Sequence, residues 1–258
     1  MMLKLNNINV SFNKGTVDEA ILFDNFNFEV SKGEFVSIVG SNGSGKTTML
    51  NLICGTVTPD SGEVIFDGRD ITKLSEHKRA KFLSRVFQDP KLGTCSNLTV
   101  LENFALADNK NKPYGLTGAI SKKRLDYYRQ LLSNCNMGLE DRLNVQIGAL
   151  SGGQRQAIAL VIAGMTKVDM IILDEHTAAL DPKSSETIMQ LTDKLIKEND
   201  LTAIMVTHNL RYAVEYGNRL IMMDKGKIIL DKAGEEKKNT KTQDILHIFN
   251  EISIECGN

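Results

Sequence analysis

The fold of this chain is decided by the stretch Gly40-Ser41-Asn42-Gly43-Ser44-Gly45-Lys46-Thr47, which fits the phosphate-loop pattern G-x-x-x-x-G-K-S/T. Its glycines allow the backbone to adopt positive φ and to approach phosphate oxygens closely. The residues directly before it, Phe35 to Val39, form a continuous apolar run, which is typical of a strand buried on both faces of a parallel sheet. A helix beginning near Gly45 would direct its positive dipole end at the same phosphates. The stretch therefore predicts an α/β core that binds a nucleotide.

Two further motifs follow the phosphate loop in order. The first is Leu150-Ser151-Gly152-Gly153-Gln154. The second is the apolar run Met170-Ile171-Ile172-Leu173, which ends in the two acids Asp174 and Glu175. A phosphate loop alone indicates only nucleotide binding. The LSGGQ stretch between the loop and the acidic strand indicates to which class of nucleotide-driven protein the chain belongs.

With these motifs in this order, the whole chain resembles the nucleotide-binding subunit of an ATP-binding cassette (ABC) transporter. Most cassettes carry proline after the two acids, but here the stretch Asp174 to Pro182 reads DEHTAALDP, with His176 in the proline position. Together with Ser151-Gly152-Gly153-Gln154-Arg155-Gln156-Ala157 and Tyr216-Gly217-Asn218-Arg219, this departure is similar to a branch that serves importers fed by substrate-binding lipoproteins, often named for aromatic amino acids. Neutral drift is the alternative explanation of His176, to which we assign no catalytic role.

The chemistry of the phosphate loop and the acids follows from their residue types. Gly40 to Gly45 would wrap backbone N–H groups around phosphate oxygens, with Lys46 giving a full charge to the β and γ oxygens. Thr47 offers a hydroxyl to Mg²⁺, which Asp174 would hold through water. Glu175 can act as the general base that polarises the attacking water. The resemblance adds an α-phosphate contact for Thr48.

Other site residues are assigned only by the resemblance. Val86-Phe87-Gln88-Asp89-Pro90 is similar to the glutamine loop, so Gln88 is expected to be a ligand of Mg²⁺ or its water and the hinge toward the helical subdomain. His208, which follows an apolar run, is similar to the switch histidine that contacts the γ-phosphate. Phe12 occupies the place of the aromatic residue that stacks on adenine. The alternative makes Phe12 an ordinary core residue, with Phe23 as its competitor.

The resemblance also implies a homodimer that sandwiches two ATP molecules. Ser151 and Gly153 would cap the γ-phosphate bound by the opposite subunit, with Gln154 beside them. Ser151 is expected to open a helix, whose dipole again favours phosphate. Ala179-Leu180-Asp181 is similar to the loop that passes information between the two sites.

We therefore predict an α/β fold: a P-loop NTPase (RecA-like) core with an N-terminal antiparallel β layer and an inserted helical subdomain. The chain would be one nucleotide-binding domain over 1–258, with its core at about 1–90 and 150–258 and the helical subdomain at about 91–149. Two turns, Asp67-Gly68 and Asp224-Lys225-Gly226, predict hairpins. A polar loop is expected over 108–115, and a terminal helix over 244–252.

Composition narrows the functional class. The chain has 258 residues and a net charge of −1, so it lacks the excess of positive charge that would indicate nucleic-acid binding. Its longest apolar stretch, Ala157 to Met165, is about half of what a membrane span needs. No secretion signal is seen at the N-terminus. Separate integral-membrane permease subunits would supply the spans, which puts this chain in the cytoplasm at the inner face of the cell membrane. The cysteines are scattered and are expected to be free thiols; they are Cys54, Cys95, Cys135 and Cys256.

Three other functions remain as alternatives to an importer ATPase. An exporter subunit would commonly carry fused membrane spans, and none is predicted. A soluble cassette of translation or DNA repair would usually carry a second cassette, coiled coils or zinc motifs. A regulator that binds nucleotide without hydrolysis is disfavoured by Glu175 and His208.

Overall fold

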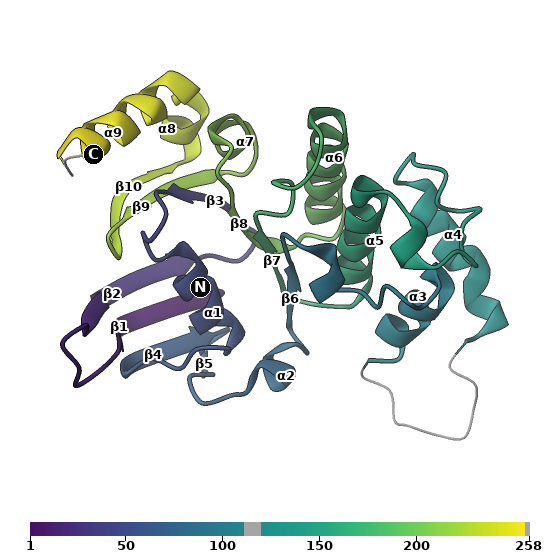
Figure 1. The fold of residues 1–258 in the computed structure, drawn as a ribbon, viewed down its shortest axis with the longest axis horizontal. Helices are drawn as coiled ribbons and strands as arrows, with labels where there is room; N and C mark the ends of the chain where they lie inside the picture. The colour runs from purple at the N-terminus through teal and green to yellow at the C-terminus, as the bar shows by residue number, and fades with distance from the viewer. Residues whose placement is uncertain (111–119, 256–258) are drawn as a thin grey trace.

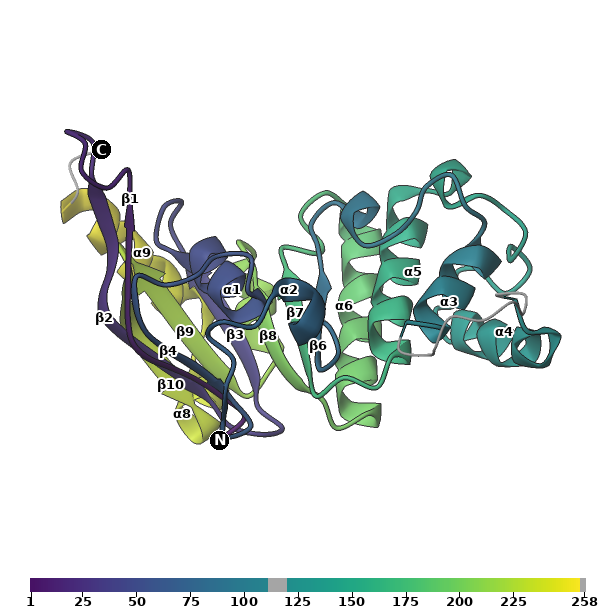
Figure 2. The same ribbon diagram turned by 90° about the horizontal axis from the view of Figure 1, so that it is seen from below.

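The computed structural model describes residues 1–110 and 120–255 (Figure 1). Most of the loop predicted over 108–115, as well as Cys256, lies outside the described residues. Two sheets and the helices around them make up the described chain. Helices α3 to α6 gather at one end of the elongated molecule, and the strands β1 and β2 lie at the other end with α9 (Figure 2).

The first sheet is antiparallel, as predicted. Its strand order is β2-β1-β4-β5. The strands are β1 (Leu3–Phe12), β2 (Ala20–Val30), β4 (Ser61–Phe66) and β5 (Arg69–Asp70). Asp67 and Gly68 join β4 to β5 with φ of 46° and 73°, as the left-handed turn expected for Asp-Gly requires. This hairpin is confirmed.

The second sheet carries the predicted parallel core, in the order β10-β9-β3-β8-β7-β6. Only β10 runs antiparallel, paired with β9 in the predicted hairpin. The strands are β3 (Phe35–Gly40), β6 (Leu83–Val86), β7 (Met170–Asp174), β8 (Thr202–Val206), β9 (Arg219–Asp224) and β10 (Lys227–Ala233). Because β3, β7 and β8 are parallel, their carboxyl ends meet at one edge, so Gly40, Asp174 and Val206 lie near one another.

Helix α1 (Lys46–Cys54) lies between the two sheets. Its residues Leu50 and Ile53 share one buried cluster with Leu5 of the antiparallel sheet and Ile38 of the parallel sheet. The same apolar core therefore fixes both sheets and the helix that follows the phosphate loop. The short helix α2 (Glu76–Arg79) follows, and its buried Arg79 donates to the carbonyl oxygens of Leu52 and Ile53 at the end of α1.

The helices at the end of the molecule away from β1 and β2 pack around α5 (Figure 1). They are α3 (Val100–Asp108), α4 (Leu125–Ser133), α5 (Gly152–Met165) and α6 (Pro182–Glu198), with the 3₁₀ turns η1 (Pro90–Leu92), η2 (Lys122–Arg124) and η3 (Ile147–Ala149). Phe104 and Tyr128 pack ring to ring between α3 and α4 at 5.3 Å. Within the described part of 91–149 the only β pairing is an isolated bridge between Thr99 and Gln146. The helical character of this segment agrees with the sequence, and its boundaries as a subdomain stay a prediction.

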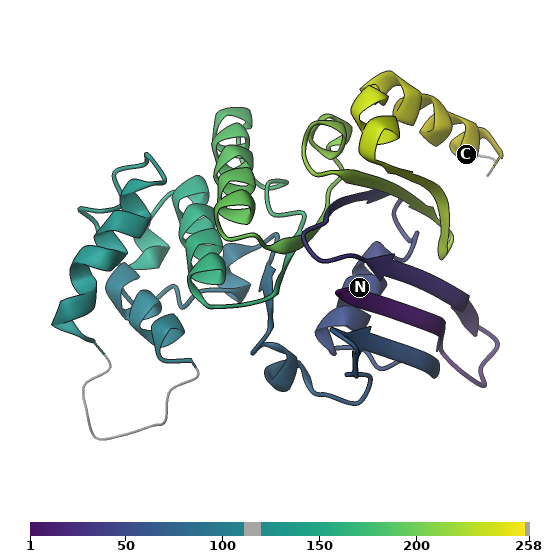
Figure 3. The same ribbon diagram turned by 180° about the vertical axis from the view of Figure 1, so that it is seen from behind.

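The C-terminal helices cover the β9–β10 side of the sheet (Figure 3). They are α7 (Leu210–Glu215), α8 (Gly234–Asn239) and α9 (Thr242–Glu255). The predicted terminal helix is confirmed and is longer than expected. Ile245 of α9 packs with Ala213 of α7 and with Leu220 and Met222 of β9. Over 1–110 and 120–255, the helices are too short or too polar to cross a membrane. Three of the four cysteines lie in the described residues, and all three are free.

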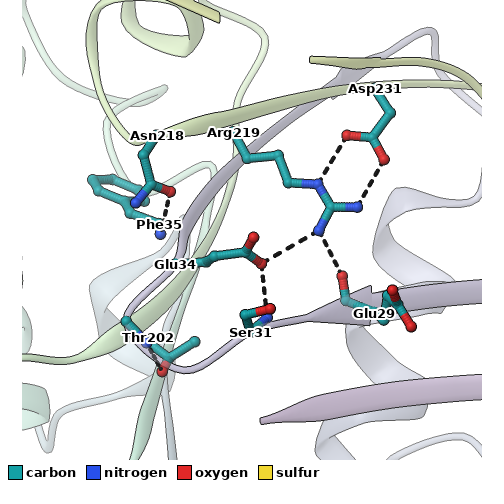
Figure 4. Close-up of polar contacts among 9 residues, drawn as sticks. Glu29, Ser31, Glu34, Phe35, Thr202, Asn218, Arg219 and Asp231 are labelled. Carbon is teal, nitrogen blue, oxygen red and sulfur yellow. Dashed lines mark hydrogen bonds and ion pairs between the residues drawn. The ribbon is translucent and has the colours of Figure 1, made fainter. Parts of the chain in front are cut away.

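Arg219 of β9 links the two sheets, because its side chain reaches β2 of the antiparallel sheet (Figure 4). Its guanidinium donates two hydrogen bonds of 2.8 and 2.7 Å to Asp231 on β10 and one of 2.8 Å to the carbonyl oxygen of Glu29 on β2. It also pairs with Glu34 at 3.3 Å. The neighbouring Asn218 accepts a hydrogen bond from the Phe35 amide at 3.0 Å. These two residues of the Tyr216–Arg219 stretch therefore hold the start of β3 in place.

Candidate functional site

The phosphate-loop stretch connects β3 to α1 at the carboxyl edge of the parallel sheet. Gly43 and Gly45 have φ of 79° and 101°, a region that favours glycine. A Cβ at Gly45 would come within 2.9 Å of the Phe23 ring. A Cβ at Gly40 would collide with the carbonyl oxygen of Met223. Both the backbone angles and the surrounding packing therefore demand glycine in this loop.

Lys46, the first residue of α1, turns its ammonium group into the loop. Its Nζ donates to the carbonyl oxygens of Gly40 and Ser41, both at 2.8 Å, and to Ser44 Oγ at 3.3 Å. Burial lowers the pKa of Lys46, while the charges of Glu175 and Asp174 oppose that shift. The loop thus encloses a cation at the end of a helix whose dipole is also positive, which is the electrostatic setting of an anion site.

Glu175 and His208 meet beside this loop. Glu175 has a φ of 48°, uncommon for a residue with a Cβ, and its amide donates to the carbonyl oxygen of Val206 at 2.9 Å. His208 Nε2 lies 2.7 Å from Glu175 Oε1. Both side chains line one hollow with Lys46, Thr47 and Thr48. The strained backbone after β7 therefore turns the Glu175 carboxylate toward the phosphate loop.

Phe12 lines the same hollow from the end of β1. It is 43% exposed, whereas Phe23 is fully buried in the core between the sheets. Phe23 is therefore the core residue, whereas the exposed Phe12 ring can contact a ligand bound at the phosphate loop.

A second hollow adjoins the first and is lined by Thr47, Gln88 and Asp174. Hydroxyl, amide and carboxylate oxygens are ligands that suit Mg²⁺. Among the described residues there is no cluster of three or more His, Cys, Asp or Glu side chains able to hold a metal alone. This donor set fits an Mg²⁺ that completes its shell with water and phosphate oxygens, as Mg²⁺ commonly does.

The LSGGQ stretch from Leu150 to Gln154, called the signature below, starts helix α5. Ser151 caps α5, where its Oγ accepts from the Gln154 amide at 3.3 Å and Gln154 Oε1 accepts from the Ser151 amide at 3.2 Å. Asp181 caps α6 in the same way by accepting from the Ser184 amide at 3.0 Å. Of the residues that the structure describes, those lining the phosphate-loop hollow do not include Ser151, Gly153, Gln154 or Asp181. Gly152 of the same stretch lines the second hollow with Thr47 and Asp174. In a single copy of the chain, however, the described lining of neither hollow includes Ser151, Gly153, Gln154 or Asp181.

Two residues that the sequence analysis did not single out contact the site. Arg85 on β6 pairs with Asp174, its Nη2 lying 2.6 Å from Oδ2. Gln156 on α5 is buried and donates to the carbonyl oxygen of Phe87 at 3.1 Å, which ties the signature helix to the residue before Gln88. The available signal for Arg85 was a charged residue beside Ser84 in the short strand between the apolar Leu83 and Val86.

Comparisons with known proteins agree with this geometry. A family model described as ABC transporter matches residues 23–178. The tyrosine transport ATP-binding protein of Clostridioides difficile is 44% identical, over 96% of this chain and 98% of that protein. The xylose/arabinose import ATP-binding protein of Sulfolobus acidocaldarius is 31% identical, over 90% of this chain and 88% of that protein.

Solved structures give the same result. One is a dimeric post-hydrolysis state of an ATP-binding cassette bound to ADP and Pi; it is 32% identical, covers 90% of this chain and 98% of its own, and has a TM-score of 0.76. A second, the ADP conformation of an ATP-binding cassette of an ABC transporter, is 27% identical, covers 100% and 99%, and has a TM-score of 0.79. The family match, the fold and the phosphate-loop site together show that this chain belongs to the ABC transporter family, as an ATP-hydrolysing cassette.

Proposed function

We propose that this protein is the ATPase subunit of an importer and that its ATP-driven homodimerisation powers transport through separate permease subunits. One observation carries the proposal. Lys46, Glu175 and His208 converge on one hollow, while the signature residues Ser151 and Gly153 lie outside it. A second copy of the chain, docked head to tail, is the arrangement that would complete each site.

The nucleotide would be held by the loop and the residues that follow it. The backbone amides of Gly40 to Gly45 and the Lys46 ammonium bind the β and γ phosphates, and Thr48 contacts the α-phosphate. Ser41, Asn42, Gly43 and Ser44 contribute through the loop backbone. The exposed Phe12 ring offers its face to adenine.

Hydrolysis would depend on Glu175. Its carboxylate accepts a proton from the attacking water, because it sits at the phosphate loop with one oxygen held by His208. His208 is 46% exposed, so the imidazole is accessible to the γ-phosphate side of the site. Thr47, Gln88 and Asp174 would hold Mg²⁺, which when bound neutralises charge on the β and γ oxygens.

The signature would act on the nucleotide of the other subunit. Ser151 Oγ is an acceptor in the helix cap, which leaves its hydroxyl proton available for a phosphate oxygen. The N-terminus of α5, with Gly153 and Gln154, adds the favourable end of a 14-residue helix dipole. Asp181, at the start of α6, would lie at the dimer interface and connect the two sites.

The partners and location follow from this assignment. Permease subunits in the membrane would dock at the segment from Gln88 to Asn97, so the protein would lie in the cytoplasm on the inner face of the cell membrane. A substrate-binding lipoprotein on the outside would deliver the solute. An amino acid is our proposal for that solute, because a relative 44% identical over nearly the whole chain is named for tyrosine transport.

Uptake measurements test this proposal. Deleting the gene in its source organism should abolish most high-affinity uptake of labelled tyrosine, and wild type should restore it while Lys46→Ala should not. Unchanged uptake of tyrosine and of the other aromatic amino acids in the deletion strain would refute the assignment to amino-acid import.

A further inference from the structure

Arg85 occupies an unusual position for a cation. It lies on β6, beside β7, and its guanidinium pairs with Asp174 at 2.6 Å. The two side chains are only 13% and 15% exposed, so this pair is largely removed from solvent. Such a pair is held together far more strongly than a surface ion pair, because water screens it poorly.

Three elements fix the Arg85 guanidinium. Its Nη1 donates to Asn51 Oδ1 on α1 at 2.9 Å, and its Cζ lies 4.9 Å from the centre of the Phe87 ring. Nε is buried and makes no hydrogen bond with any residue that the structure describes. The guanidinium therefore touches the helix after the phosphate loop, the acid at the end of β7 and the residue before Gln88.

The same guanidinium lines the hollow that contains Thr47, Gln88 and Asp174. Asp174 thus has a cation of the protein on one carboxylate oxygen. A divalent metal approaching that carboxylate would meet the positive charge of Arg85 as well as that of Lys46 nearby. Like charges at short range in a poorly hydrated site repel strongly. The phosphates of a bound nucleotide would supply the negative charge that offsets this repulsion.

We propose that Arg85 is an internal counter-ion of Asp174 that makes divalent metal binding conditional on nucleotide. This inference rests on the metal site proposed above. Arg85 is a positioning residue, since it acts on the metal through Asp174. A purely structural Arg85 would instead serve only to pack β6 against β7, and its replacement would affect metal binding no more than it affects the fold.

Mn²⁺ binding, measured by electron paramagnetic resonance on the full chain, tests the inference with Mn²⁺ as the probe. We compare wild type, Arg85→Met, Asp174→Asn and the double variant, each without nucleotide and with saturating ADP. Arg85→Met should bind Mn²⁺ without nucleotide at least about fivefold more tightly than wild type, because a nearby positive charge is gone. ADP should then improve Mn²⁺ affinity by a smaller factor than in wild type.

Controls separate this effect from others. Arg129→Met removes an exposed arginine of α4 and should behave as wild type. ADP binding in EDTA and far-ultraviolet circular dichroism report whether each variant keeps the fold and the phosphate loop. Arg85→Gln provides a second neutral variant, which decides the matter if Arg85→Met does not fold.

The outcomes are distinguishable. If Asp174→Asn leaves Mn²⁺ binding to the ADP complex unchanged, the proposed metal site itself is wrong. If Asp174→Asn weakens that binding but the neutral Arg85 variant binds Mn²⁺ as wild type or more weakly, only the role of Arg85 is overturned. The same tightening in the Asp174→Asn background would also overturn it, because Arg85 would not then act through Asp174.

Discussion

Replacing His176 should remove a specific part of the acid sensitivity of this protein. His176 is only 2% exposed, and its Nε2 lies 3.0 Å from Thr192 Oγ1 on α6. Thr192 Oγ1 already donates to the carbonyl oxygen of Ile188 at 2.8 Å, so the imidazole Nε2–H is the donor in the histidine–threonine bond. Burial lowers the pKa of His176 from 6.5 to about 4, so the ring is neutral at pH 7.

The sign and size of the effect follow from that pKa. Between pH 6.5 and about 4 the unfolded chain binds a proton at His176 that the folded chain does not, so stability falls as pH falls through this window. Full stability from this group is present above pH 6.5. From pH 7 to pH 5 the free energy of unfolding should drop by about 2 kcal/mol because of His176 alone.

Urea unfolding followed by far-ultraviolet circular dichroism measures this, since the chain has no tryptophan. His176→Gln keeps a donor for Thr192 and does not titrate, so its stability should fall by about 2 kcal/mol less than that of wild type between pH 7 and pH 5. His77→Gln, at an exposed histidine, is the matched control and should follow wild type. Equal pH dependence in wild type and His176→Gln would show that His176 is not the source of this acid sensitivity.

Three further experiments test the dimer, the link between the two sheets and the permease contact. Lys46→Ala should abolish ATP-dependent dimerisation, because the variant chain no longer binds its own ATP. Ser151→Ala should weaken dimerisation, while the affinity of the monomer for ATP stays within about threefold of wild type. Calorimetry on the monomer beside size analysis of the dimer checks this, and equal loss of monomer affinity would contradict the sandwich. Arg219→Ala should lower the free energy of unfolding by about 2 kcal/mol, because four acceptor atoms lose a charged donor. Urea unfolding measures this change. A change within about 0.5 kcal/mol, which an ordinary surface substitution gives, would show that Arg219 does not stabilise the contact between the sheets. Cysteines at residues 91–100, where Cys95 is already exposed, should cross-link to a cytoplasmic permease loop, and cross-links only from the 244–252 end would contradict the dock.

The sequence predicted those features whose signals are local. The apolar runs became parallel strands because strands buried on both faces lack alternation, as Ile171 and Ile204 illustrate with both fully buried. The Asp67-Gly68 turn and the start of α5 after Ser151 were likewise set by neighbouring residues. The phosphate loop was recognisable because each glycine is required by φ or by a close approach.

Contacts between distant residues could not be predicted in this way. Arg85 and Asp174 are 89 residues apart, and Arg219 reaches Glu29 across 190 residues. No periodicity or turn signal marks such pairs, because the partners are set by how the two sheets pack. His176 stood out in the sequence as a departure from the family pattern. Its hydrogen bond to Thr192, 16 residues later, could not be predicted, because it depends on where α6 packs in the fold.

Turnover by Glu175→Gln is the most direct test of the central claim that this carboxylate is the base of an ATP-driven dimer. The substitution removes the proton acceptor beside the phosphate loop and leaves Lys46 and Thr47 in place to hold nucleotide. ATP hydrolysis should fall at least about a hundredfold, and the ATP-loaded variant should elute as a stable dimer under conditions where wild type does not. Hydrolysis within a few-fold of wild type would show that Glu175 is not the base, and a variant that stays monomeric with ATP bound would show that ATP does not drive dimerisation.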